Sequence, residues 1–260
     1  MNTKKQAKRQ ITTEELLDYL KGKKTEEQLD YLKGKKQVKK QTKADKEAGN
    51  LSATAKTALI REYSRMVDGR MDDIFSKPMQ KGTQQEDESI TLLSRYDGKF
   101  YVKNERRIDN LYISGECDID DNKGNKIIDI KSSWSNTTFL QSMMKPLDSD
   151  YYWQGQGYCW LYNRPRFEIA FVLVDATEEI IESEKRRYLW SIGNPDEHNE
   201  YIMEHLKQIE RNHRFDDMPI EYRVFKHCVE RNDADIERIP AKVEKAREFM
   251  QEIFQKRIAK

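Results

Sequence analysis

The sequence predicts an α/β domain that follows a basic N-terminal extension. Short runs of β-branched and aromatic residues alternate with longer segments in which apolar residues recur at helical spacing. Turn residues, such as Asp97-Gly98 and the segment DNKGN at 121–125, separate several of these runs. Strands that alternate with helices in this way form a mixed β-sheet with helices on either side.

Composition limits the class of protein. The chain has 260 residues, of which 37% are hydrophobic, which is enough for one sizeable domain and an appendage. Its apolar runs stay well short of the ~18 residues that cross a bilayer. The basic start MNTKKQAKRQ is not followed by the apolar stretch of a secretory signal. We therefore expect no membrane partner and a cytoplasmic location.

The cysteines argue against a disulfide framework and against a sulfur-ligated metal. Cys117, Cys159 and Cys228 are odd in number and far apart in the sequence. Reduced thiols in a core explain this spacing better than an iron-sulfur cluster or a zinc site. A metal, if the protein uses one, is expected to be held by oxygen ligands.

Residues 1–50 form the predicted extension, and residues 51–260 form the predicted domain. Positions 1–48 carry 14 Lys and Arg against 8 Asp and Glu, whereas the remainder carries 33 against 38. Within the extension, TEELLDYLKGKK at 13–24 is followed directly by TEEQLDYLKGKK at 25–36. We expect short helices or a disordered, solvated arm. The alternative is an arm that attracts nucleic-acid phosphates without sequence preference.

The predicted elements follow in chain order. Helices are expected at 51–71 and 84–96, followed by strands at 99–106, 110–120 and 126–133. A helix at 150–163 leads to a strand at 166–175, then to helices at 177–192 and 196–212. A strand at 220–230 and a helix at 239–258 complete the domain.

The apolar strand KIIDIKSS holds two charged residues. Side chains two apart share one face of a strand, so Asp129 and Lys131 stand together while Ile128 and Ile130 face the other way. Hairpin pairing across the turn at 121–125 brings Asp118 close to Asp129. Two adjacent carboxylates repel each other unless a cation lies between them, and Mg²⁺ prefers such oxygen ligands.

The alternative interpretation is structural. The triplet Asp-x-Lys occurs three times, at Asp97, Asp121 and Asp129, and only the third occurrence lies in an apolar strand. Burying charge there costs free energy unless a partner compensates it. A buried ion pair between Asp129 and Lys131 would supply that partner without any catalytic role.

Four ordered segments resemble the PD-(D/E)XK nuclease superfamily, in particular its RecB-like and lambda-exonuclease-like (YqaJ-type) members. SGECDI and IIDIKSS resemble the Gly-x-x-Asp strand and the Asp/Glu-x-Lys strand of that family. KGTQQEDESI resembles its first motif, and YYWQGQGYCWLY resembles its Gln-x-x-x-Tyr helix. The resemblance covers residues 50 to 255 and implies a restriction-endonuclease-like core, with a central mixed β-sheet flanked by helices.

The resemblance also implies roles for individual residues. Asp118 and Asp129 would bind metal together with the backbone carbonyl of Ile130, and Lys131 would position the attacking water. Glu86 would complete the site or hold a second ion, although Asp87 and Glu88 adjoin it; Asp120 competes with Asp118 for its role. The supporting or nucleic-acid-binding residues would be Gln154, Tyr158, Ser132 and Ser133, and Arg61 and Arg65 on the first helix are candidates for backbone contacts. For Tyr158 core packing is the alternative, and for the arginines a solvated helix face.

The implied activity is hydrolysis of phosphodiester bonds with Mg²⁺, for which Mn²⁺ can substitute, and without an iron-sulfur cluster. The expected enzyme is an exonuclease that acts on duplex DNA ends in recombination or repair. A structure- or site-specific endonuclease is one alternative, and a catalytically inactive binding or assembly protein on the same fold is another. DNA is the expected partner, with a homo-oligomer and a single-strand annealing or recombination protein as further candidates.

Overall fold

The computed structural model describes residues 50–70, 76–193 and 199–259. The chain divides into two compact units. One comprises Arg70–Val243, and the other joins the segment before Arg70 to Glu244–Lys260. The predicted N-terminal arm and its twelve-residue repeat lie outside the described residues.

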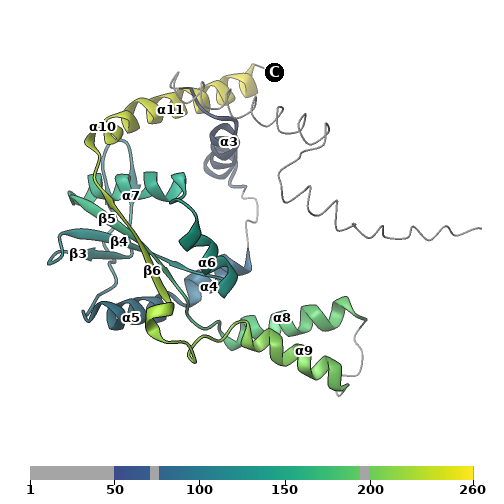
Figure 1. The fold of residues 1–260 in the computed structure, drawn as a ribbon. Helices are drawn as coiled ribbons and strands as arrows, with labels where there is room; N and C mark the ends of the chain where they lie inside the picture. The colour runs from purple at the N-terminus through teal and green to yellow at the C-terminus, as the bar shows by residue number, and fades with distance from the viewer. Residues whose placement is uncertain (1–49, 71–75, 194–198, 260) are drawn as a thin grey trace, which may run out of the picture. The chain divides into compact units, whose positions relative to one another are not determined.

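The larger unit is built on a four-stranded sheet in the order β3-β4-β5-β6 (Figure 1). Its strands are β3 (Ile119–Asp121), β4 (Lys126–Ser132), β5 (Arg166–Val172) and β6 (Val224–Glu230). β4 and β5 run parallel, whereas β3 and β6 pair antiparallel to their neighbours. A second, two-stranded sheet pairs β1 (Ile108–Asp109) with β2 (Ser114–Gly115).

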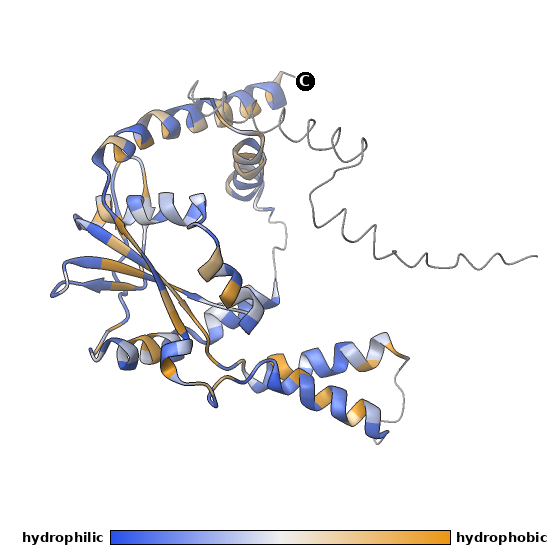
Figure 2. Ribbon diagram, viewed as in Figure 1, coloured by the Kyte–Doolittle hydropathy of each residue, from blue (hydrophilic) through white to orange (hydrophobic). Residues whose placement is uncertain are grey.

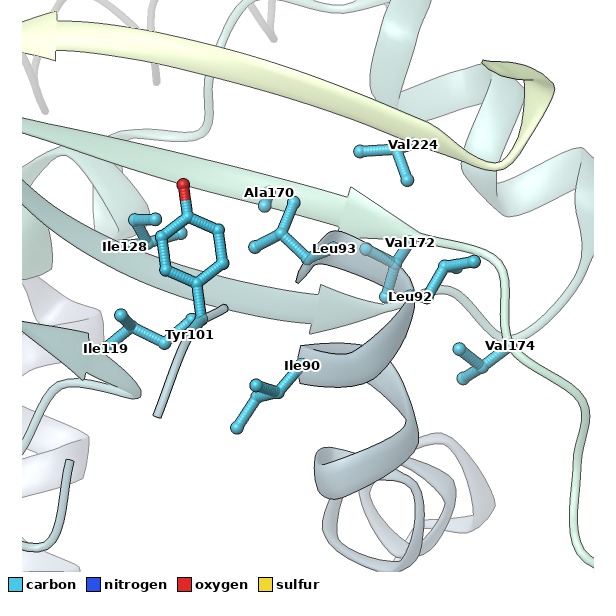
Figure 3. Close-up of a cluster of buried hydrophobic side chains, with 10 residues drawn as sticks. All are labelled: Ile90, Leu92, Leu93, Tyr101, Ile119, Ile128, Ala170, Val172, Val174 and Val224. Carbon is cyan, nitrogen blue, oxygen red and sulfur yellow. The ribbon is translucent and has the colours of Figure 1, made fainter. Parts of the chain in front are cut away.

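Helix α5 (Glu86–Asp97) covers one face of the four-stranded sheet. Its buried residues Ile90, Leu92 and Leu93 belong to one apolar cluster with side chains of the sheet (Figure 3). Those sheet residues alternate along the strands, as in Ala170 and Val172 of β5, because successive side chains of a strand point to opposite faces. The alternation assigns each strand residue to one of the two cores.

Helices α6 (Asn136–Met144) and α7 (Ser149–Tyr162) connect β4 to β5 and cover the opposite face. Phe139 and Cys159 of these helices share a buried cluster with Ile127 and Ile169 of the strands. Helix α7 begins at the N-cap Asp148 and ends at Asn163, which adopts the left-handed conformation with φ 51°. Parallel strands need a crossover connection, and here α6 and α7 form the crossover from the end of β4 to the start of β5.

Further helices surround the sheet. Helix α4 (Lys77–Gln84) precedes α5, and α8 (Glu178–Ser191) pairs with α9 (Glu200–Arg211) in a hairpin that extends away from the sheet (Figure 1). A short 3-10 turn at Ile220–Tyr222 leads into β6, and α10 (Asp233–Ile236) follows it. Hydrophobic colour concentrates on the central strands, while α9 alternates along its length (Figure 2). Within the described residues, every helix is too short or too polar to cross a membrane.

The smaller unit contains α3 (Ala53–Asp68) and most of α11 (Arg238–Ile258). Arg257 near the end of α11 forms an ion pair of 2.6 Å with Asp68. Lys56 of α3 lies 5.7 Å from the ring centroid of Phe249. These contacts join the two helices near both ends of α3.

The predicted fold class is confirmed: helices flank a mixed sheet. The strand predicted at 99–106 is wrong, because that segment forms no strand. Its side chains Phe100 and Val102 are exposed, and the buried Tyr101 instead donates a hydrogen bond of 2.8 Å to Asp97. The single strand predicted at 110–120 is divided into β2 and β3, which belong to different sheets.

Candidate active site

The charged residues of β4 lie on the face covered by α7. Ile127, which shares the face of Asp129 and Lys131, packs in the α7 core, whereas Ile128 and Ile130 pack against the α5 core. Asp129 is almost completely buried, and its backbone is fixed on one side by pairing with Ile169 of β5. The alternation expected from the sequence is therefore present, with an ionisable residue at a core position.

Asp118 immediately precedes β3 and is carried to Asp129 by the β3–β4 hairpin. The register pairs Ile119 with Ile128, so the next position places Asp118 opposite Asp129. The backbone N–H of Ile130 donates a hydrogen bond of 2.5 Å to Oδ2 of Asp118. This bond fixes the Asp118 carboxylate beside the strand that carries Asp129.

Asp120, the competing residue, has cationic partners of its own. Arg164 donates a hydrogen bond of 2.7 Å to Asp120 Oδ1, and Arg106 lies 3.4 Å from Oδ2. Two arginines therefore neutralise this carboxylate. Of the two aspartates, Asp118 is the one whose pKa the charge of Asp129 helps to raise.

Burial disfavours the ionised form of both carboxylates, and the charge of Asp129 adds to this effect at Asp118. Burial raises the pKa of Asp118 to about 6, and the charge of Asp129 adds to the increase, against the opposing hydrogen bond from Ile130. Burial also raises the pKa of Asp129, although Lys131 opposes that shift. The site therefore holds more negative charge than its own lysine compensates, which is the condition under which a bound cation is favoured.

Lys131 and Asp129 form the ion pair that was the structural alternative. Nζ lies 2.6 Å from Oδ2 of Asp129, yet this buried oxygen has no hydrogen bond of acceptable direction. The two groups form a close ion pair, but the angle at the contact is unsuitable for a hydrogen bond. A lone pair of Oδ2 therefore stays available to a bound ion or water. Nζ also lies 4.9 Å from the ring centroid of Tyr151, and the Lys131 side chain is 26% exposed, so its ammonium can reach solvent.

Gln154 and Tyr158 lie together on α7, one helical turn apart. The Gln154 amide donates a hydrogen bond of 3.1 Å to the Tyr158 hydroxyl. Burial raises the pKa of Tyr158 to about 12, and the charges of Asp129 and Asp118 add to the increase, which keeps the phenol protonated. A Cβ atom at Gly115 would come within 2.7 Å of the Tyr158 ring. The glycine of the Gly-x-x-Asp segment is thus required by the close approach of α7.

Glu86 is the first residue of α5, and it is held by a lysine. Lys103 Nζ lies 2.8 Å from Oε2 of Glu86. The charges of Glu86 and Asp118 also help raise the pKa of Lys103, which places this lysine beside the acidic pair. Among the described residues, no three His, Cys, Asp or Glu side chains come together as a metal-binding group. In this arrangement Glu86 is directed to Lys103.

The remaining candidates lie in two places. The Ser132 hydroxyl is 2.8 Å from the hydroxyl of Ser89 on α5, and Ser133 is buried where β4 ends. Arg61 and Arg65 belong to α3 in the smaller unit, where Arg65 pairs with Glu62. The structure therefore places the serines at the end of β4, directly after Lys131, and the arginines in the smaller unit.

Sequence reasoning missed three lysine and tyrosine contacts around the site. Lys103 binds Glu86, Tyr151 lies beneath Lys131, and Lys81 contacts the end of β4. Lys81 adjoins Gly82 in the first motif and Tyr151 opens the Gln-x-x-x-Tyr helix segment, so both stood within the quoted segments. Lys103 had no such signal, because it lies in the segment that was wrongly predicted as a strand.

Comparison with known proteins identifies the fold. No family model matches the chain, and no curated protein matches it. Among solved structures, a phage-related exonuclease from Haemophilus somnus 129PT is 26% identical, with a TM-score of 0.62 over 82% of this chain and 88% of that one.

An alkaline exonuclease from Laribacter hongkongensis is 18% identical, with a TM-score of 0.53 over 80% of this chain and 86% of that one. The same enzyme in complex with dAMP is 19% identical, with the same TM-score and coverage. These matches define the fold as that of the phage-type and alkaline exonucleases. This fold agrees with the resemblance of the four ordered motifs to the lambda-exonuclease-like members of the PD-(D/E)XK nuclease superfamily.

Proposed function

We propose that this protein is a divalent-metal-dependent deoxyribonuclease that removes nucleotides from duplex DNA ends. The observation that carries the proposal is the buried acidic pair of Asp118 and Asp129, whose charge exceeds that of Lys131. An ion pair kept only for structure has no need of the second aspartate. The structural neighbours are exonucleases, which supports action at DNA ends.

The donor set fits a small hard cation. Asp118 and Asp129 offer carboxylate oxygens, and the Ile130 carbonyl adjoins them on the same strand. One oxygen of Asp129 is buried without a directed hydrogen bond, so it can accept a bond from a ligand. When bound, Mg²⁺ would supply a hydroxide-like water and would neutralise charge that develops on the phosphate.

Lys131 is the residue placed to act on the attacking water. Its ammonium has three donors, and only one direction is taken by Asp129. The ring of Tyr151 limits the positions that the side chain can adopt. From there Lys131 can hold the water oxygen in line with the phosphorus atom, or donate to a phosphate oxygen as negative charge builds on it.

Gln154 and Tyr158 would hold the scissile strand. Because Tyr158 accepts its hydrogen bond from Gln154, its own hydroxyl hydrogen remains free to be donated. The raised pKa, about 12, keeps that hydrogen in place at neutral pH. A neutral donor beside two carboxylates can bind a phosphate oxygen without adding to their repulsion.

The test compares linear duplex DNA with covalently closed duplex DNA in the presence of Mg²⁺, with Asp129→Asn as the control for contaminating nucleases. We expect the parental protein to degrade the linear duplex, to spare the closed circle and to be inactive with EDTA. Equal cleavage of both substrates would identify an endonuclease instead. Absence of cleavage with both Mg²⁺ and Mn²⁺ would leave the binding or assembly role.

A further inference from the structure

A buried lysine outside the acidic pair contacts the end of the same strand. Lys81 of α4 has 0% of its surface exposed. Its Nζ donates a hydrogen bond of 2.9 Å to the carbonyl oxygen of Ser133 and lies 5.1 Å from the ring centroid of Phe215. In the described part of the chain, no carboxylate pairs directly with this ammonium; Asp175 attracts it through space, and Arg223 repels it.

Burial makes this lysine costly for the fold. It lowers the pKa of Lys81 to about 8, with Asp175 opposing the shift and Arg223 adding to it. An apolar side chain of similar length would fill the same volume without the cost of desolvating a charge. Stability alone therefore does not explain a lysine at this position.

The contact that Lys81 makes fixes a particular piece of backbone. The N–H of Ser133 donates to the carbonyl of Val172 on β5 at 2.8 Å, so that with Lys81 both polar groups of the Ser133 backbone are bound. One residue earlier, Ser132 contacts Ser89 of α5. Lys131 directly precedes these two anchored residues, and its side chain leaves β4 where the strand is held from both α4 and α5.

We propose that Lys81 is a positioning residue for the nuclease reaction. It binds the Ser133 carbonyl and so fixes the end of β4 that presents Lys131 beside the acidic pair. It also holds α4, and through it the start of α5 with Glu86, in register with that strand. The inference rests on the proposed function, and it assigns Lys81 no contact with DNA or with the metal ligands.

Lys126 provides a matched control on the same strand. It is also buried, at 6% exposed, and lies at the opposite end of β4, where it pairs with Glu168 at 2.7 Å. Lys126→Met removes a buried ammonium from β4 without touching the end that carries Lys131. Lys81→Met removes the buried ammonium that binds the Ser133 carbonyl at the end of β4 next to Lys131. Both substitutions keep an unbranched side chain in a buried site.

The experiment measures kcat and KM on linear duplex DNA, unfolding by urea, and hydrogen exchange of the amides at 132–134. For Lys81→Met we expect kcat about 10-fold lower with KM unchanged, because small misplacements of a reacting group carry penalties of up to ~10²-fold. Its amides at 132–134 should exchange faster, and its stability should fall less than that of Lys126→Met, because removal of a buried charge offsets the lost hydrogen bond to Ser133. For Lys126→Met we expect lower stability with parental kcat and parental exchange at 132–134.

The two hypotheses fail in different ways. A parental protein that does not cleave DNA overturns the proposed function, and the exchange measurement then still decides whether Lys81 holds the strand. A parental kcat in Lys81→Met, a loss confined to KM, or an equal loss of kcat in Lys126→Met overturns the positioning role. If Lys81→Met does not fold, Lys81→Arg takes its place, because arginine keeps a buried cation that can donate a hydrogen bond. For Lys81→Arg we expect parental exchange of the amides at 132–134 and a kcat within about 3-fold of the parental value. Fast exchange of these amides in Lys81→Arg would contradict the inference.

Discussion

Strand β4 carries two buried charge clusters, one on each face, and they differ in their balance of charge. On the α5 face, Lys126 pairs with Glu168 at 2.7 Å. Lys226 of β6 lies 3.5 Å from Glu168 and 2.5 Å from Asp97. Two cations thus meet two carboxylates, and the hydroxyl of Tyr101 adds a hydrogen bond to Asp97. Each carboxylate of this cluster has a cation within 4 Å, so its charges balance, although Oε2 of Glu168 lacks a directed hydrogen bond.

On the α7 face, Asp118 and Asp129 share the single ammonium of Lys131. Nearby, Lys103 is already paired with Glu86. Burial raises the pKa of Asp118 to about 6, and the charge of Asp129 adds to the increase. A balanced cluster needs no further charge, whereas the repulsion in an unbalanced acidic pair is relieved either by protonation or by a bound cation. From this comparison we propose that the α5-face cluster is structural and that the α7-face cluster is the ligand site.

The largest expected effects on cleavage and stability come from replacing one carboxylate of β4's two charge clusters by its amide: Asp129→Asn on the α7 face and Glu168→Gln on the α5 face. Asp129→Asn should lower cleavage more than ~10²-fold, because loss of a direct ligand should exceed the cost of losing an outer-shell contact. Its stability should not fall, because one of two repelling carboxylates is gone. Glu168→Gln should instead lose about 3 kcal/mol of stability and keep parental cleavage.

Cleavage of linear DNA under saturating Mg²⁺ and urea unfolding check both substitutions. If Glu168→Gln loses as much activity per folded molecule as Asp129→Asn, the two clusters are not functionally distinct. Excess Mn²⁺ is expected to recover part of the activity of Asp129→Asn and to leave Glu168→Gln unchanged.

Lys131→Met should lower kcat roughly 10²-fold, the scale of a lost acid-base group, with little change in DNA affinity. Its Asp129 would be left without its cation, so metal binding by the folded variant is measured alongside. Binding of labelled duplex in Ca²⁺ and single-turnover cleavage in Mg²⁺ separate affinity from chemistry. A folded variant with the parental rate returns Lys131 to the status of an ion-pair partner.

The smallest expected effect is a pH dependence of stability in the metal-free protein. The folded-state pKa of Asp118 lies above its unfolded value, so folding favours the protonated form. The stability that this group contributes is present below pH ~4 and is lost as pH rises toward about 6. Relative to Asp118→Asn, we expect the free energy of unfolding to fall on the order of 2 kcal/mol across that window.

Urea unfolding in EDTA at stepped pH measures this difference, and saturating Mg²⁺ should reduce it. Parallel pH profiles for the parental protein and Asp118→Asn would mean that Asp118 is not under charge repulsion in solution.

The sequence predicted the parts of the site that depend on strand periodicity. Asp129 and Lys131 share a face because alternation in a strand is local, and the turn at 121–125 was enough to bring Asp118 into register. The helix pair of Gln154 and Tyr158 followed from spacing of one turn. These relations need only a few neighbouring residues.

The rest depended on long-range packing. The segment at 99–106 contains strand-forming residues, but Tyr101 is held by Asp97 and no neighbouring strand pairs with it in the described part of the chain. Lys81 and Ser133 lie 52 positions apart, and their contact exists only because α4 packs on β4. No pattern within either segment specifies that contact.

The most direct test of the unbalanced acidic cluster is a crystal structure of the parental protein at saturating Mn²⁺, with Asp129→Asn as the control. Anomalous density is expected beside Asp118 and Asp129, with carboxylate oxygens at roughly 2.0–2.3 Å from the ion, between the Mg²⁺ and Ca²⁺ ranges. The variant should lack that density. Absence of density in the parental protein, with Lys131 still bound to Asp129, would contradict the account.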